Sequence, residues 1–286
     1  MWNATEELFA ELPTNGFVWI EGQTQPYQGE MQVIIQKIAA VTPTPEDLAI
    51  LLPSTKRDIE EMFSQLYMIL MSLENPAINA LAQTYLADSK LMDKFRVAPA
   101  AMTLHHAYLG GLLEHTLSLM QLADGMLGHY PLLNRDIVLM GLFLHDLGKT
   151  HELTWETGFG YTDQGQLVGH IARGLTMLHD TIRECESQGT KIPQPIFMVL
   201  EHIIISHHGK PEFGALKVPS TPEAIFISHM DDLDAKMQMA LSNTRSDDES
   251  ADVTDAANET AGGRFTEKLW ALDTRLYRPD PTKISE

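Results

Sequence analysis

Apolar positions follow a strand-like pattern near the N-terminus of the chain. In residues 16–41, two stretches rich in β-branched and aromatic residues flank a turn that contains Gln, Pro and Gly. This pattern predicts a β-hairpin. An isolated hairpin is only marginally stable in water, so we expect it to pack on another surface of the protein. The Thr-Pro-Thr-Pro segment at 42–45 then breaks the chain, and helical patterning begins near Glu46.

The central part of the chain carries apolar residues at helical spacing. Proline, glycine and asparagine residues separate successive periodic segments. We therefore predict an all-α fold, a helical domain at 46–241 preceded by the short β-hairpin. The helices are expected near 57–73, 76–88, 103–128, 135–149, 168–187, 193–208 and 221–241.

The C-terminal region has a different composition. Residues 242–262 are acidic and poor in large apolar side chains, which predicts a flexible linker. The following segment, FTEKLWALDTRLYRP at 265–279, is amphipathic and aromatic, which predicts a short helix docked on the helical domain. The chain then divides into an N-terminal segment at 1–45, a helical domain at 46–241 and a C-terminal region at 242–286.

Charge and cysteine content narrow the functional classes. The formal net charge of −19 and the lack of a long Lys/Arg cluster argue against broad nucleic-acid affinity, although bound metal cations would change the local balance. The single cysteine, Cys185, excludes an internal disulfide and a cysteine-based zinc site. There is no apolar run of membrane-spanning length, and the N-terminus lacks the basic residues of a signal peptide. We therefore expect a cytoplasmic protein without a membrane partner.

Histidine and aspartate residues occupy inward positions on several predicted helices. His115 lies on a leucine stripe, His207 ends an isoleucine stripe, and Asp231 lies on the apolar face of the last long helix. One such histidine alone would ordinarily be a core or capping residue. A buried carboxylate is costly unless it is paired or bound to metal. Several inward His and Asp residues without Lys or Arg neighbours therefore favour metal coordination.

The sequence HDLGK is the most specific feature of the chain. Adjacent helical residues point about 100° apart, so His145 and Asp146 reach one site only if it lies beside their turn, where Asp146 can bridge two ions. Lys149 follows one turn later, in a position to meet an anionic substrate.

These residues occur in the order of the HD-superfamily signature, an all-helical fold of metal-dependent phosphohydrolases. A longer set of motifs resembles the HD-domain 3′→5′ exoribonucleases of the YhaM type, over roughly residues 16–241 and 263–279. The matching segments are APAAMTLHHAYLGGLLEHT (98–116), GLFLHDLGKTHEL (141–153), GQLVGHI (165–171), ISHHGKPEFG (205–214), SHMDDLDAKM (228–237) and the C-terminal FTEKLWALDTRLYRP.

The resemblance implies a two-metal site and names its residues. Asp146 would bridge the ions, and Lys149 would contact the scissile phosphate. His106 would contact the substrate, the alternative being a role in helix packing or capping. The implied ligands are His115, His145, Asp146, His170, His207, His208 and Asp231, with His208 dispensable if the site held a single metal.

The resemblance also implies the reaction, while the substrate stays open. Two divalent ions would activate water for phosphoester hydrolysis, and His and carboxylate ligands without Cys suit Mn, Fe, Co, Ni or Zn. The family carries an OB-type barrel before the HD domain, and here only residues 16–41 match its last strands. A 3′→5′ exonuclease acting on short single-stranded RNA or DNA is the first hypothesis. The alternatives are a phosphohydrolase of small nucleotides or cyclic dinucleotides, which the acidic charge favours, and a non-catalytic scaffold. A homo-oligomer is compatible with each.

Overall fold

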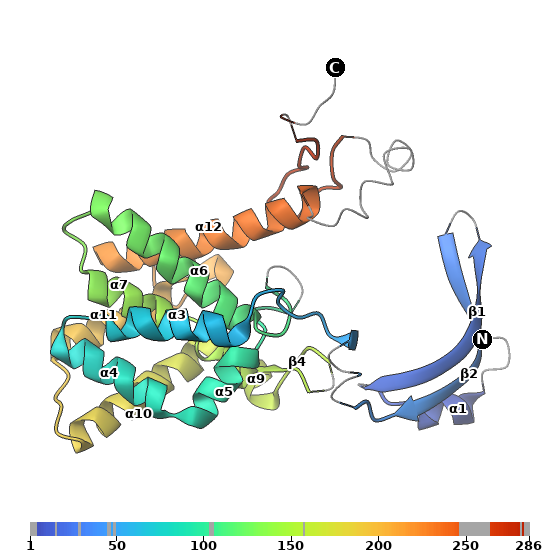
Figure 1. Ribbon diagram of the computed structural model, residues 1–286, viewed down its shortest axis with the longest axis horizontal. Helices are drawn as coiled ribbons and strands as arrows, with labels where there is room; N and C mark the ends of the chain where they lie inside the picture. Colours follow the sequence, from blue (N-terminus) through green and yellow to red (C-terminus); the bar gives the residue numbers. More distant parts are fainter. Residues whose placement is uncertain are drawn as a thin grey trace.

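The computed structural model describes residues 5–14, 16–27, 30–44, 47, 50–102, 106–156, 158–245, 264–280 and 282. The described chain consists of a helical body and a separate N-terminal β-hairpin (Figure 1). No helix in these ranges is both long and apolar enough to cross a membrane. The predicted class, helical with an N-terminal hairpin, is confirmed.

The hairpin pairs two long antiparallel strands. After the short helix α1 (Glu6–Glu11), β1 (Phe17–Tyr27) pairs with β2 (Glu30–Val41), in a register that runs from Phe17↔Val41 to Tyr27↔Glu30. A bulge lies between Glu21 and Gly22, where a Cβ on Gly22 would come within 2.5 Å of a backbone oxygen of β2.

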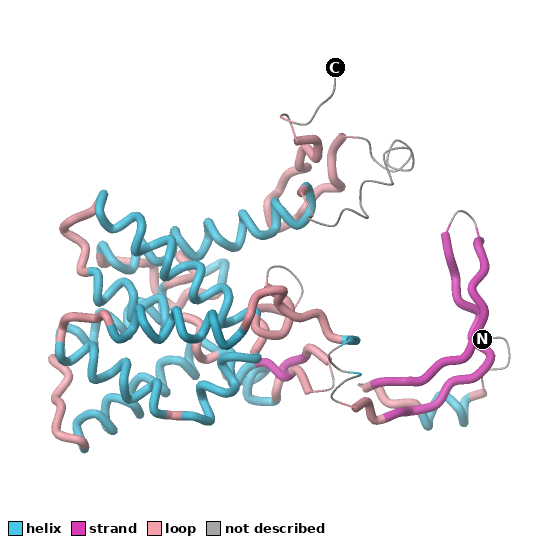
Figure 2. Tube along the Cα trace, viewed as in Figure 1, coloured by secondary structure: helices cyan, strands magenta, loops and turns pink. Residues whose placement is uncertain are grey.

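The expectation that this hairpin packs on the helical domain is wrong. Figures 1 and 2 show β1 and β2 extending away from the body. Trp19 and Val33 are 51% and 50% exposed. The two strands pair with each other along their whole length, and most of their apolar side chains remain exposed.

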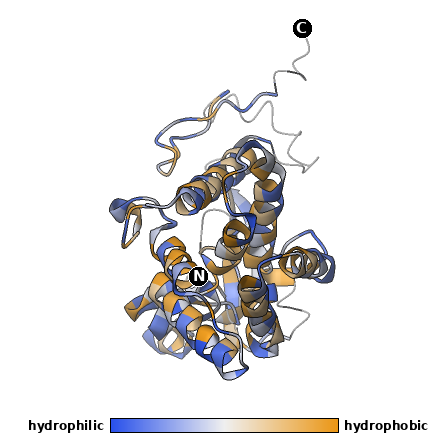
Figure 3. Ribbon diagram, turned by 90° about the vertical axis from the view of Figure 1, so that its left-hand side faces the viewer, coloured by the Kyte–Doolittle hydropathy of each residue, from blue (hydrophilic) through white to orange (hydrophobic). Residues whose placement is uncertain are grey.

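Most helices of the body are amphipathic and pack around one apolar core, and Figure 3 shows blue hydrophilic and orange hydrophobic stretches side by side on the helical ribbons. Short elements and connections complete it: the 3₁₀ turns η1 (Leu127–His129) and η2 (Pro211–Phe213), and a small antiparallel pair of β3 (Leu153–Thr154) and β4 (Gly160–Tyr161). The helices are α3 (Ile59–Met71), α4 (Pro76–Ala87), α5 (Ser89–Val97), α6 (Gly111–Met126), α7 (Arg135–Leu144), α8 (Lys149–Glu152), α9 (Asp163–Leu167), α10 (Gly169–Ser187), α11 (Gln194–Ser206) and α12 (Pro222–Thr244).

Helix α7 is the centre of the body. Its sequence, RDIVLMGLFL, is apolar on every side after the first turn, and every residue from Asp136 to Leu144 is buried. Helices α3, α4, α6, α11 and α12 surround it. The Phe143 ring packs edge-on against Tyr85 and Phe95, with ring centroids 5.8 and 5.7 Å apart. A helix that is apolar all round must be buried, and α7 therefore delivers the residues that follow it to the middle of the fold.

Several predicted helix boundaries need correction. Helix α5 was not predicted, and the helix expected at 103–128 begins only at Gly111, because Gly110 and His106 adopt left-handed backbone conformations with φ of 80° and 52°. The helix expected at 135–149 ends at Leu144, and a turn separates it from α8. The last helix continues to Thr244, into the predicted linker. Most of that linker, 246–262, lies outside the described residues, as does Glu46.

The helix predicted at 265–279 is absent. The segment turns back on itself through bridges that pair Phe265 with Tyr277 and Leu269 with Thr274. Thr266 accepts the backbone N–H of Leu276 at 2.9 Å, which holds the turn closed. An isolated helix of this length is only marginally stable in water, so the hydrogen bonds of the turn replace those of the predicted helix. Trp270 is 76% exposed, so its ring is not docked on the helical domain as expected.

Candidate metal centre

Five helices bring histidine and aspartate side chains to one point inside the body. His115 comes from α6, His170 from the first turn of α10 and Asp231 from α12. The remaining four follow directly after two apolar helices: His145 and Asp146 after α7, and His207 and His208 after α11. All seven residues predicted as ligands therefore gather here.

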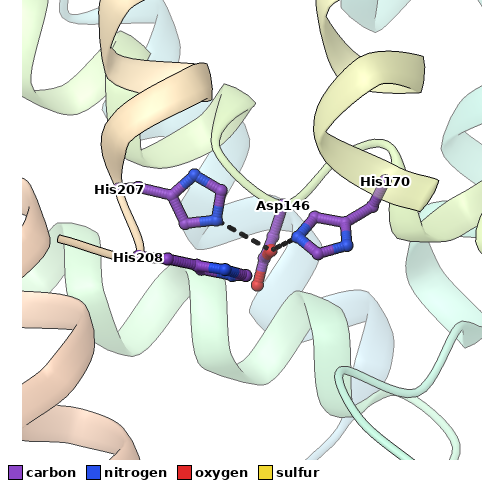
Figure 4. A group of neighbouring side chains, drawn as sticks. All are labelled: Asp146, His170, His207 and His208. Carbon is purple, nitrogen blue, oxygen red and sulfur yellow. Dashed lines mark ion pairs between the residues drawn. The ribbon is translucent and has the colours of Figure 1, made fainter. Parts of the chain in front are cut away.

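The Asp146 carboxylate lies at the middle of this group and faces two ways. Its Oδ1 is 3.5 Å from His170 Nε2 and 3.6 Å from His207 Nε2 (Figure 4). Its Oδ2 is 3.4 Å from His145 Nε2 and 3.7 Å from His115 Nε2. One carboxylate thus separates two sets of imidazoles.

Each set includes a further potential donor. Ligand atoms of His208, His170, His207 and Asp146 all lie within 4.8 Å of one another. On the other side, Asp231 Oδ1 lies 3.3 Å from His115 Nε2 and 3.9 Å from His145 Nε2. We call these the His207 side and the His115 side of Asp146. Each offers three groups in addition to the shared carboxylate.

The helix ends fix two of the imidazole rings. His145 Nδ1 donates to the Leu142 carbonyl at 2.6 Å, and His207 Nδ1 donates to the Ile204 carbonyl at 2.8 Å. The last carbonyls of a helix have no intrahelical partner, so each ring caps the helix that carries it. This arrangement holds both rings with Nε2 directed at Asp146.

The same tautomer follows for the other histidines. Carbonyl and carboxylate oxygens only accept, so an Nδ1 beside such an oxygen carries the proton, and Nε2 of the neutral ring is left with its lone pair for a metal. In each case Nδ1 has such a partner: Asp234 Oδ2 at 2.8 Å for His115, Glu152 Oε2 at 2.9 Å for His170, and the Phe213 carbonyl at 2.8 Å for His208.

The centre has the properties that a divalent cation requires. Asp146 Oδ1, His170 Nε2 and His207 Nε2 are buried and have no hydrogen-bond partner among the described residues. All three are electron-pair donors directed at one point, and leaving them without a partner is costly. A bound cation would satisfy them together, so the residues present fit a metal ion.

The carboxylates of the site attract positive charge, which a proton on His115 supplies without a metal and which a bound cation would supply in its place. Burial would lower the pKa of His115, but hydrogen bonds to the carboxylates of Asp231 and Asp234 prevail and raise this pKa to about 9. Burial would raise the pKa of Asp146, but Lys149 and His145 hold it well below its usual value. Burial lowers the pKa of His207 and takes that of His208 to about 4. Both rings are therefore neutral at pH 7, and each can donate an electron pair to a metal ion.

The two predicted substrate contacts occupy different positions. Lys149 Nζ lies 2.7 Å from Asp146 Oδ2, at the centre itself, with 14% of its side chain exposed. His106 is buried behind His115: its Nε2 lies 3.2 Å from Asp234 Oδ2 and its Nδ1 lies 2.8 Å from the Tyr108 hydroxyl. The roles of both residues in substrate binding stay predictions.

Two carboxylates that orient the imidazoles were not predicted from the sequence. The Asp234 carboxylate accepts a hydrogen bond from the His115 ring. The Glu152 carboxylate contacts the His170 ring and also accepts the His170 backbone N–H at 3.1 Å. Both lie three residues after a predicted site residue, Asp231 and Lys149 respectively, on the same side of the helix. That spacing was the available indication of their role.

Gly148 lets α10 approach the turn that carries Asp146. A Cβ on this residue would lie 2.1 Å from the His170 carbonyl oxygen and 2.9 Å from the backbone nitrogen of Gly174. Any other residue would therefore push the first turn of α10, and His170 with it, away from Asp146.

Comparisons with known proteins agree with this geometry. Residues 112–236 match the HD domain family. The chain is 32% identical over 284 residues to the "3'-5' exoribonuclease YhaM" of Geobacillus sp. (strain WCH70), an alignment that covers 98% of this chain and 81% of the relative. No solved structure matches the chain significantly. This extent of identity, together with the HD domain, shows that the chain belongs to the HD-domain family of YhaM-type 3′-5′ exoribonucleases.

Proposed function

We propose that the protein is a metal-dependent phosphodiesterase that removes nucleotides from the 3′ end of short single-stranded RNA. The observation that carries the proposal is the position of Asp146, whose two carboxylate oxygens face separate sets of imidazole nitrogens. Such a carboxylate suits a bridge between two divalent ions. The direction of attack and the RNA substrate are inferred from the likeness to the YhaM relative.

The proposed ligands fall into two groups around Asp146. His115, His145 and Asp231 would hold one ion, and His170, His207 and His208 the other, with Asp146 shared. Nitrogen and oxygen donors without sulfur suit Mn, Fe, Co, Ni or Zn. When bound, two such ions polarise a phosphoryl oxygen and lower the pKa of water.

The protein's own groups orient and stabilise this centre. Glu152 and Asp234 fix the rings of His170 and His115, so that no reorganisation is needed when substrate arrives. Lys149 is held beside Asp146 by an ion pair in which the carboxylate raises the lysine pKa despite burial. Its ammonium group would lie near the non-bridging oxygens of the scissile phosphate and offset their developing negative charge.

The net charge of −19 supports one alternative, a hydrolase of mononucleotides or cyclic dinucleotides on the same metals.

The test of the proposed function combines elemental analysis and activity assays on one sample. The purified protein is assayed with Mn²⁺ on a 3′-labelled and a 5′-labelled RNA octamer beside a nucleotide panel. About two metals per chain and stepwise 3′ shortening would support the exonuclease. Turnover of small nucleotides alone would select the alternative. A protein without metal and without activity would favour the hypothesis of a non-catalytic scaffold.

A further inference from the structure

A polar cleft lies beside the metal centre and has no role in the chemistry described above. Its volume is about 400 Å³, and it is formed between α5, α8, the β3–β4 turn and α9. The residues that line it include one exposed lysine, one tryptophan and several side chains that form hydrogen bonds: Lys94, His151, Thr154, Trp155, Thr162 and Gln164, with Thr150, Leu153 and Glu156 completing the wall.

The cleft and the metal centre lie on opposite sides of the single turn of α8. Lys149 and Glu152 leave this turn toward Asp146 and His170, whereas His151, two residues after Lys149, lines the cleft. Residues two apart on a helix point about 200° apart, which explains the division. A helix with its side chains is about 10–12 Å across, so the cleft is within the reach of a few nucleotides from Asp146.

Hydrogen bonds join the cleft wall to α8. The Thr162 hydroxyl donates to the His151 carbonyl at 2.7 Å, and the Thr162 backbone N–H donates to the Glu152 carbonyl at 2.9 Å. The cleft is therefore held in a fixed position relative to the side chains that face the metal centre.

The side chains that line the cleft offer groups that complement those of a nucleotide. Trp155 packs partly against the core and presents a large aromatic surface, and Gln164 carries an amide that can both donate and accept. The Thr150 hydroxyl donates to the Leu147 carbonyl at 2.8 Å, so it accepts from His151 Nδ1 at 3.0 Å. His151 Nε2 is then an acceptor suited to a ribose hydroxyl or a base amino group.

Two cationic side chains, Lys94 and Arg173, act on the His151 side of the cleft. Burial and the nearby charges of Arg173 and Lys94 together lower the pKa of His151 to about 4, against a smaller opposing effect of Asp88. Arg173 Nε is buried without a hydrogen-bond partner among the described residues. Glu156 is the acidic side chain in the wall. In a chain with a net charge of −19, this is a place where a phosphate can approach.

We propose that this cleft is a subsite for a nucleotide of single-stranded RNA, a few positions upstream of the 3′ end that is cleaved. The base would stack on Trp155 and the phosphate would lie near Lys94, with His151 and Gln164 bonding the sugar or base edge. The inference rests on the proposed function, since it assigns the cleft to the same substrate. Stacking on an aromatic side chain is tolerant of sequence, as an exonuclease requires.

The test compares a long and a minimal substrate on the full-length, metal-loaded protein. The long substrate is an RNA octamer, and the minimal one is bis(p-nitrophenyl) phosphate, which has no base or sugar to reach the cleft. Trp155→Ala is expected to raise KM for the octamer about 5- to 150-fold, the range that stacking contributes per base. Trp155→Phe should retain most of the affinity for the octamer. KM for bis(p-nitrophenyl) phosphate should not change in either variant. Octamer binding to the same metal-loaded protein is also measured, by fluorescence polarisation of a labelled RNA octamer whose phosphorothioate linkages resist hydrolysis.

Two further variants keep the test decisive. Lys94 is exposed, so Lys94→Ala leaves the fold intact and should weaken octamer binding with a reduced salt dependence. Lys191→Ala, the same charge change at an exposed site beyond the far end of α10, is the matched control and should bind normally. Unchanged octamer binding in both Trp155→Ala and Lys94→Ala would overturn the subsite. Octamer binding that depends on Trp155 in a protein that hydrolyses neither substrate would support the subsite and refute the proposed reaction.

Discussion

Asp234 accepts a hydrogen bond from His115, with 2.8 Å between the carboxylate Oδ2 and the imidazole Nδ1. The same oxygen lies 3.2 Å from His106 Nε2, and His106 in turn contacts the Tyr108 hydroxyl. Asp234 therefore links the residue predicted to touch substrate, His106, to a proposed metal ligand. His106 is also buried and adopts a left-handed backbone conformation, with φ of 52°.

Replacing Asp234 with alanine should weaken one metal ion selectively. Losing a carboxylate that orients a histidine ligand typically costs about 10- to 100-fold in metal affinity. We expect the His115 side of Asp146 to lose its ion at limiting metal while the His207 side keeps one. Metal content after dialysis against graded Mn²⁺ measures this. Asp232→Ala is the control, because the Asp232 side chain is exposed and paired with Lys236. Two ions bound to Asp234→Ala with normal affinity would refute the role.

Replacing Lys149 with methionine should separate catalysis from metal binding. The methionine keeps most of the side-chain volume but removes the charge beside Asp146. Removing one group that stabilises transition-state charge typically lowers kcat about 100- to 1,000-fold. We expect this loss in kcat with the metal content of the wild type. A Lys149→Met protein with normal kcat would show that the lysine serves only to pair with Asp146.

A methyl group at Gly148 should disturb both stability and the site. The added Cβ would meet backbone atoms of α10 rather than flexible side chains, so the helix must move. Overpacking of this kind costs about 1–3 kcal/mol of the free energy of unfolding. We expect Gly148→Ala to lower the thermal midpoint and the metal affinity together.

Gly125→Ala provides the matched control for Gly148→Ala. Gly125 lies within α6, and nothing surrounds its Cβ position within 4 Å. Alanine there should stabilise the protein by about 0.5–1 kcal/mol. Equal effects of the two substitutions would contradict the assigned close approach at Gly148.

Asp136 should matter for stability but not for the reaction. Its buried carboxylate accepts the backbone N–H groups of Glu74 and Asn75 at 2.9 and 2.6 Å, and so joins α7 to the start of α4. Removing it leaves both donors without their acceptor, at a cost of about 1–3 kcal/mol. Urea unfolding of Asp136→Ala should reveal this loss, while kcat and metal content per folded molecule stay at wild-type values. A loss of metal in the folded variant would contradict a purely structural role.

The sequence by itself determined the helical class, most of the long helices and the inward placement of His115, His145, Asp146, His207 and Asp231, while the resemblance to the HD family added His170 and His208. The reason is local: an apolar stripe at helical period requires a helix with one buried face, and a His or Asp on that stripe must point inward. The run IVLMGLFL in the helix predicted at 135–149 is apolar on all sides, so this helix is buried in a helical fold, and His145 and Asp146 directly follow it.

Tertiary structure decided the rest. It split the imidazoles between the two oxygens of Asp146, placed Asp234 and Glu152 behind His115 and His170, and set the hairpin apart from the body. It also closed the C-terminal segment into a turn where its pattern predicted a helix. These outcomes depend on contacts between segments far apart in the chain, whose energies are absent from any local pattern of polar and apolar residues.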